Sequence, residues 1–191
     1  MSTVASKLMT AEEFYDWANH PDNRDKYCEL ERGEIVEMTR PGILHGFVCA
    51  NVVVILSAYC RQRKKGYVCS NDTGVIVERD PDTVRGPDVL LLEDVSSVEA
   101  MDRKWGKNPP VLAVEVLSPT DTFAKINRRV QEQLRFGTPL VWVLDPDASN
   151  VTVYRPGQPY YVVERDEELT GNDVLPDFRC KVAEVFTMPG Q

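Results

Sequence analysis

The sequence predicts an α/β fold in which a mixed β-sheet is flanked by helices and carries β-hairpins at its edges. The segment at residues 120–136 has helical periodicity and separates two apolar strands, 111–117 and 140–144, which indicates a crossover helix. Paired short runs at 27–38 and 151–163 each surround a glycine-containing turn, which favours hairpins. A length of 191 residues fits one domain, so we expect residues 1–191 to form a single unit with its core at about 10–186.

The first half of the chain begins with a helix. Thr10, followed three residues later by Glu13, is a capping box that starts this helix, and the segment around Pro21 ends it. The hairpin at 27–38 comes next. Apolar residues at helical spacing then predict a helix over 45–65, where a closing basic run suits the helix dipole.

The second half alternates strands and turns. Residues 67–77 are predicted as one strand with a break near Asn71, and residues 88–92 as another, with a loop or short helix over 94–108. Thr120 or Asp121 is expected to cap the crossover helix, which runs to Phe136 before Gly137. After the hairpin at 151–163, residues 169–186 are predicted as a loop with short pieces that pack back on the body.

Composition is that of an ordinary globular protein, with 42% hydrophobic and 27% charged residues. We expect no apolar run of membrane-spanning length, and residues 1–10 lack the apolar core of a secretory signal, so the predicted location is cytoplasmic. The five cysteines are odd in number and none is spaced C-x-x-C, which favours buried thiols over a disulfide framework or a zinc site.

The net charge of −8 counts against a protein that coats nucleic acid nonspecifically, because phosphate binding needs positive charge. Two local runs could still line a basic cleft on an acidic body, or simply form solvated helix faces. They are Arg61, Arg63, Lys64 and Lys65, and then Lys125, Arg128, Arg129 and Arg135.

Two carboxylates carry the main functional prediction. Glu115 lies inside the most apolar strand, where a carboxylate is costly unless a cation compensates it, although an exposed sheet edge would also accommodate it. Asp88 opens another strand after Gly86-Pro87, where a turn aspartate is the alternative. On adjacent strands the two would reach one divalent ion, and such hard oxygen ligands suit Mg²⁺ or Mn²⁺.

Four further residues are candidates for the same cleft. Arg129 lies on the flank of the apolar face of the crossover helix and Lys125 further round, and either could stabilise phosphate charge or be ordinary surface charge. Glu29 could be a third carboxylate or a cross-strand surface partner. His45 could contact phosphate or water, or act as a cap or packing residue.

A series of ordered motifs resembles the Uma-type restriction endonuclease family, which belongs to the PD-(D/E)xK nuclease superfamily. The resemblance runs from about Thr10 to Phe186. Its motifs are YCELERGEIVEM at 27–38, HG at 45–46, TVRGPDV at 83–89, VEVLSP at 114–119, LVWVLDP at 140–146, VTVYRPG at 151–157 and DVLPDF at 173–178.

The resemblance implies a restriction-endonuclease-like core, a Mg²⁺-type ion, hydrolysis of DNA phosphodiester bonds and a homodimer. It maps the family's Asp and Glu onto Asp88 and Glu115, and it makes Glu29 and His45 cleft residues. The superfamily lysine would stand where this chain has Leu117, and the family's helical lysine corresponds to Arg129. Arginine cannot act as a base at neutral pH, though it can still bind phosphate, and Lys125 could substitute from one turn earlier.

Two hypotheses follow from these residues. The first is a Mg²⁺-dependent DNA endonuclease. The second is a nuclease fold that has lost hydrolysis and binds DNA or a protein partner, which the arginine at position 129 and the acidic net charge favour.

Overall fold

The computed structural model describes residues 8–188 and residue 190. Most of residues 1–10, which were predicted not to be a secretory signal, lie outside the described residues. The first layer consists of one helix and a small sheet. Thr10 caps α1 (Ala11–Ala18) through the predicted capping box with Glu13. This helix covers a four-stranded sheet in the order β2-β1-β5-β4. The strands are β1 (Cys28–Glu31), β2 (Glu34–Glu37), β4 (Val75–Glu78) and β5 (Thr83–Arg85).

The second layer is a six-stranded mixed sheet in the order β10-β9-β8-β7-β6-β3. Only β7 and β8 pair in parallel, and α3 makes the predicted crossover between them. The elements are β3 (Tyr67–Ser70), β6 (Val89–Leu92), β7 (Leu112–Val116), α3 (Phe123–Phe136), β8 (Val141–Asp145), β9 (Asn150–Tyr154) and β10 (Tyr161–Val163).

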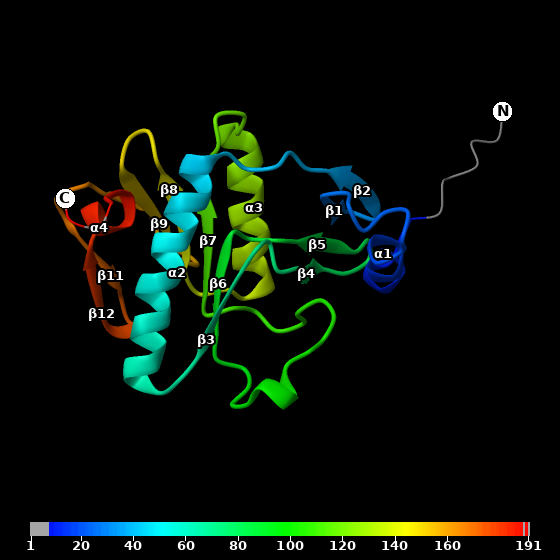
Figure 1. Cartoon of the computed structure of the whole chain (residues 1–191), viewed down its shortest axis with the longest axis horizontal. Coiled ribbons are helices and arrows are strands. Elements are labelled where there is room, and N and C mark those ends of the chain that lie inside the picture. Colours follow the sequence, from blue (N-terminus) through cyan, green and yellow to red (C-terminus); the bar gives the residue numbers. More distant parts are fainter. Residues whose placement is uncertain (1–7, 189, 191) are drawn as a thin grey trace.

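The two long helices lie on opposite faces of this sheet (Figure 1). On one face, α2 (Ile43–Arg63) packs Val48, Val52 and Leu56 against alternate residues of β6 and β7. On the other face, α3 packs Ile126 and Val130 against those residues of β6 and β7 whose side chains point away from α2. Both faces of the central strands are therefore buried, as expected for near-continuous apolar runs.

The C-terminal segment corrects the sequence-based prediction. Residues 169–186 were expected to be mostly loop, but they form a hairpin of β11 (Glu168–Gly171) and β12 (Leu175–Lys181), followed by α4 (Val182–Phe186). The hairpin packs Leu169 and Phe178 into the core beneath α2. Its strands carry only one β-branched residue, Thr170, so the local strand pattern is weak and burial against α2 decides the structure.

Three other predictions also change. Residues 67–77 form two strands in different sheets, because Asn71 and Asp72 both adopt positive φ and redirect the chain. A strand, β5, occupies residues where none was predicted. The crossover helix is capped by Thr122, whose hydroxyl accepts from the backbone N–H of Lys125, rather than by Thr120 or Asp121.

Helix α2 contradicts the expectation that no apolar run reaches membrane-spanning length. By length and composition alone, this 21-residue helix could cross a bilayer. Core helices of soluble proteins pass the same test, and one side of α2 lies against the central sheet in this fold. Its length is therefore weak evidence for a membrane span.

Candidate functional site

The candidate site lies where β6 begins and β7 ends, beside the start of α2. Residues Val89 and Val114 are register partners in the antiparallel pair, so continuing the register by one residue sets Asp88 opposite Glu115. A hydrogen bond from the backbone to a side chain reinforces this placement, since the N–H of Val116 donates to Oδ2 of Asp88 at 2.7 Å. The two predicted carboxylates thus stand on adjacent strands.

Glu115 is the most deeply buried acid of the cleft. Its Oε2 accepts from Nε of Arg129 at 2.9 Å, whereas its Oε1 is buried without a hydrogen-bond partner among the described residues. Burial raises the pKa of Glu115 to about 8, although Arg129 opposes this shift, and the charges of Asp88 and Glu29 add to it. Burial of this carboxyl is therefore compensated only in part, and a bound cation would offset the remainder.

Arg129 is buried and makes three directional contacts. Besides Glu115, its Nη1 donates to Oε2 of Glu29 at 2.7 Å and its Nη2 to the carbonyl of Gly86 at 3.2 Å. Burial alone would lower the pKa of Arg129, but the two carboxylates raise it well above its ordinary value. A planar guanidinium with five donors suits such a divided task better than an ammonium does.

Glu29 uses both of its carboxylate oxygens in the same hydrogen-bond network. One oxygen accepts from the backbone N–H of Gly86 at 2.9 Å, and the other accepts from both Arg129 and Arg85. Burial would raise the pKa of Glu29, yet these two arginines hold it below the usual value. Both oxygens of Glu29 are thus satisfied by the protein itself.

A second buried arginine supports the first. Arg85, from β5, donates to both oxygens of Glu132 on α3, at 2.6 Å through Nε and 3.0 Å through Nη2. It also reaches Glu29 at 3.0 Å and Glu31 at 3.1 Å. This network ties the small sheet to the crossover helix directly behind the cleft. Neither Arg85 nor Glu132 was predicted as a site residue, and Glu132 stands among the polar residues of α3 without a distinguishing sequence signal.

His45 approaches from the first turns of α2. Its Nε2 lies 3.2 Å from Oδ1 of Asp88, and its Nδ1 lies 3.5 Å from the thiol of Cys49 one turn later. The hydrogen bond to Asp88 is the main cause that raises the pKa of His45 to about 10, with a contribution from Cys49. The structure thus brings His45 to Asp88. Cys49 was missed, although its spacing four residues after His45 was visible in the sequence.

The residues enclose a cleft of about 280 Å³. Asp88, Glu115, His45, Arg129 and Lys125 all line it, whereas Glu29 lies behind Arg129. The Nζ of Lys125 lies 3.0 Å from Oδ1 of Asp121, and its side chain is 40% exposed, against 8% for Arg129. Arg129 faces the sheet and Lys125 faces the solvent side of the same cleft.

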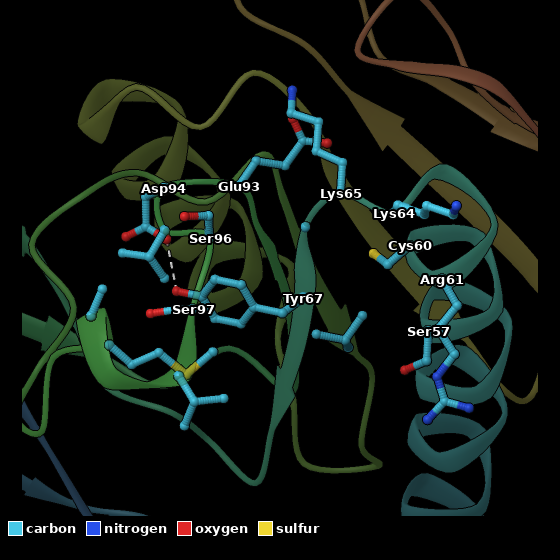
Figure 2. A pocket seen from close by; sticks show the side chains of 16 residues that line it. Ser57, Cys60, Arg61, Lys64, Lys65, Tyr67, Glu93, Asp94, Ser96 and Ser97 are labelled. Atoms are coloured by element: carbon cyan, nitrogen blue, oxygen red, sulfur yellow. Dashed lines mark hydrogen bonds and ion pairs between the residues drawn. The ribbon is translucent and has the colours of Figure 1, made fainter.

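A larger cavity of about 870 Å³ lies at the other end of α2, and Figure 2 shows its lining. The basic run Arg61, Lys64 and Lys65 borders it, together with Glu93 and the loop after β6. Arg61 of this lining lies 16 residues after His45 on the same helix, which separates the two residues by about 24 Å along the axis. This run therefore does not line the carboxylate cleft, whereas Lys125 from the second run does.

The comparisons with known proteins give a family. A family model named Uma2, described as "Putative restriction endonuclease", matches residues 11–183. The chain belongs to the Uma2 family. The family places it among restriction-type nucleases, in agreement with the resemblance seen in the sequence motifs.

A solved structure supports the fold of this Uma2 member. A nuclease from Anabaena variabilis ATCC 29413, described as "putative" and as belonging to DUF820, superposes with a TM-score of 0.75 and 20% sequence identity. The superposition covers 93% of this chain and 97% of the other. No curated protein matches the chain. At this identity the likeness establishes the shared fold, and function has to be argued from the cleft.

Proposed function

We propose that this Uma2 protein is a divalent-metal-dependent DNA endonuclease that hydrolyses phosphodiester bonds. The observation that carries the proposal is the buried Oε1 of Glu115, which has no partner among the described residues and lines the same cleft as Asp88. A buried polar atom without a partner is costly, so its retention favours a ligand that supplies the missing contact.

The donor set fits a hard cation. Asp88 and Glu115 both offer carboxylate oxygens, which suit Mg²⁺ or Mn²⁺. A positive ion would also offset the burial that now raises the pKa of Glu115. When bound, such an ion supplies an activated water and stabilises the negative charge that develops on the phosphate.

The residues of the chain have separate tasks in this proposal. Arg129 binds Oε2 of Glu115 and so leaves Oε1 for the ion, and Glu29 in turn fixes Arg129. His45 orients Asp88 from α2. Because every nitrogen of Arg129 already donates to a protein acceptor, we assign phosphate contact to Lys125, which is half-exposed at the mouth of the cleft.

The test combines metal binding with catalysis. Mn²⁺ binding is measured by calorimetry for the wild type, for Glu115→Gln and for Glu93→Gln, a carboxylate variant in the other cavity. Plasmid nicking is measured in parallel at low salt. We expect Glu115→Gln to lose both Mn²⁺ binding and nicking, and we expect the wild type and Glu93→Gln to keep both. Mn²⁺ binding that survives in Glu115→Gln would reject the assignment of the metal site.

A second candidate function rests on Arg129. This arginine occupies the position of the family's helical lysine and cannot exchange a proton at neutral pH. A chain that binds metal and DNA without cutting would suit this substitution. The same experiment separates the two: Mn²⁺ binding with DNA retention but no nicking favours the binding protein.

We also propose a cytoplasmic homodimer. The free state of all five cysteines suits a reducing compartment. Ile43 and Val54 are 94% and 67% exposed, and they lie eleven residues apart on α2, which is close to three full turns. An apolar stripe of this kind favours self-association. We expect Val54→Glu to convert a dimer to a monomer in sedimentation velocity, and a wild type that is monomeric at all concentrations would reject the dimer.

A further inference from the structure

His45 and Cys49 present a nitrogen and a sulfur on one face of α2, because residues four apart on a helix are neighbours. The carboxylate of Asp88 faces them from the start of β6. One ligand atom from each of the three residues lies within 4.8 Å of the others. Among the residues that the structure describes, this is the one group of three such side chains with that proximity.

The chemistry of this group differs from that of the carboxylate pair. A thiolate and an imidazole are ligands for Zn²⁺ and similar thiophilic ions, whereas Mg²⁺ prefers oxygen atoms. Cys49 packs against the core and contributes nothing to a Mg²⁺ site, but its sulfur also lies at the nitrogen of His45, where a thiophilic ion could use it.

The surroundings permit an ion to bind between the three side chains. His45 and Asp88 are partly buried, with side-chain exposures of 12% and 13%, and they line the open cleft rather than the closed core. Their present contacts, His45 to Asp88 and His45 to Cys49, are hydrogen bonds that a metal replaces while releasing the protons of the imidazole and the thiol. Water from the open cleft is available for the remaining positions.

We propose that His45, Cys49 and Asp88 form a binding site for a thiophilic divalent ion of the Zn²⁺ class. Asp88 belongs both to this site and to the Mg²⁺-type site of the proposed function. An ion held by Cys49 and His45 therefore takes a carboxylate away from the catalytic ion and inhibits hydrolysis. Only this inhibitory effect rests on the proposed function, because the binding of the ion does not require the protein to be a nuclease.

Co²⁺ is the probe that tests the binding. A cobalt–thiolate bond gives an intense charge-transfer absorption in the near ultraviolet, which oxygen and nitrogen ligands do not produce. We expect this band in the wild type, its loss in Cys49→Ser, and its retention in Cys69→Ser, a matched variant of a partly buried thiol on β3. Added Zn²⁺ should bleach the band by displacing Co²⁺.

Affinity measurements guard against a variant that fails to fold. Loss of an outer-shell partner of a metal ligand costs about 10–100-fold in affinity, so the loss of a direct ligand should cost at least that much. We expect Cys49→Ser to lower the Zn²⁺ affinity relative to the Mn²⁺ affinity by at least about 10-fold. A misfolded variant would lose both ions together.

Clear outcomes overturn the proposal. They are the absence of a thiolate band in the Co²⁺-loaded wild type, a band that persists in Cys49→Ser, or an unchanged ratio of Zn²⁺ to Mn²⁺ affinity. If wild type shows the band but never nicks DNA, the proposed nuclease function fails and the thiophilic site stands. If it nicks DNA, we expect Zn²⁺ to inhibit the wild type at lower concentrations than it inhibits Cys49→Ser.

Discussion

Arg129 donates through Nε to Oε2 of Glu115 at 2.9 Å and through Nη1 to Oε2 of Glu29 at 2.7 Å. Glu115 belongs to the six-stranded sheet and Glu29 to the four-stranded sheet, while Arg129 comes from the helix between them. One guanidinium thus joins the two sheets at the base of the cleft. The position of the candidate metal ligand is therefore coupled to the packing of the two layers.

Removal of this guanidinium should destabilise the fold strongly. Arg129→Met leaves two buried carboxylates without their shared cation, and breaking a buried pair in this way costs about 3–5 kcal/mol. Arg128→Met is the matched control on the same helix, because Arg128 is 51% exposed and exposed pairs contribute about 0–1 kcal/mol. Urea denaturation measures both. Equal losses in the two variants would contradict the structural role of Arg129.

Gly86 is required by a close backbone approach. A Cβ at this position would lie 2.5 Å from the carbonyl oxygen of Asp72, and Gly86 also binds both Glu29 and Arg129 through its backbone. We expect Gly86→Ala to lower both stability and Mn²⁺ affinity. Gly46→Ala is the contrasting change, because a Cβ there meets nothing within 4 Å and the helix should gain about 0.5–1 kcal/mol. Thermal unfolding and calorimetry decide, and a tolerated Gly86→Ala would contradict this geometry.

A substitution at Lys125 should distinguish phosphate contact from metal binding. Its ammonium is half-exposed at the cleft, and among the described residues its one ion-pair partner is Asp121. We expect Lys125→Gln to slow nicking by about 100-fold, the effect of losing one donor to a developing charge, while Mn²⁺ affinity changes little. Lys107→Gln serves as a surface control, since Lys107 is 63% exposed and outside the cleft. Normal nicking by Lys125→Gln would assign the phosphate contact elsewhere.

The metal-free protein should lose stability as the solution becomes alkaline. The folded pKa of His45 is raised from 6.5 to about 10 by Asp88, so its contribution is complete below pH 6.5 and is lost as the pH rises through about 10. Denaturation in the presence of EDTA measures this slope. We expect His45→Gln to flatten it, whereas His20→Gln, a change at an exposed histidine, should preserve it. Identical slopes for wild type and His45→Gln would disprove the pairing.

The sequence was sufficient for elements with strong local signals. The capping box at Thr10, the hairpin at β1 and β2, and the crossover between two apolar strands are all confirmed. The predictions from sequence were wrong where tertiary packing, rather than local sequence, decides the structure. The β11–β12 hairpin is stabilised by burial under α2, and the direction change after β3 depends on positive φ at Asn71 and Asp72. Neither effect produces periodicity in the sequence.

For the site, the sequence by itself determined which residues deserved attention, because Glu115 in an apolar strand is costly without a cation. Asp88 on the neighbouring strand followed from the same logic. Only the tertiary structure decided their partners. It buried Arg129 against Glu115, used Glu29 to hold that arginine, and brought Cys49 beside His45 and Asp88. The two contacts of Arg129 join residues 14 and 100 positions apart, and their distances depend on how the two sheets pack against α3, which no local pattern encodes.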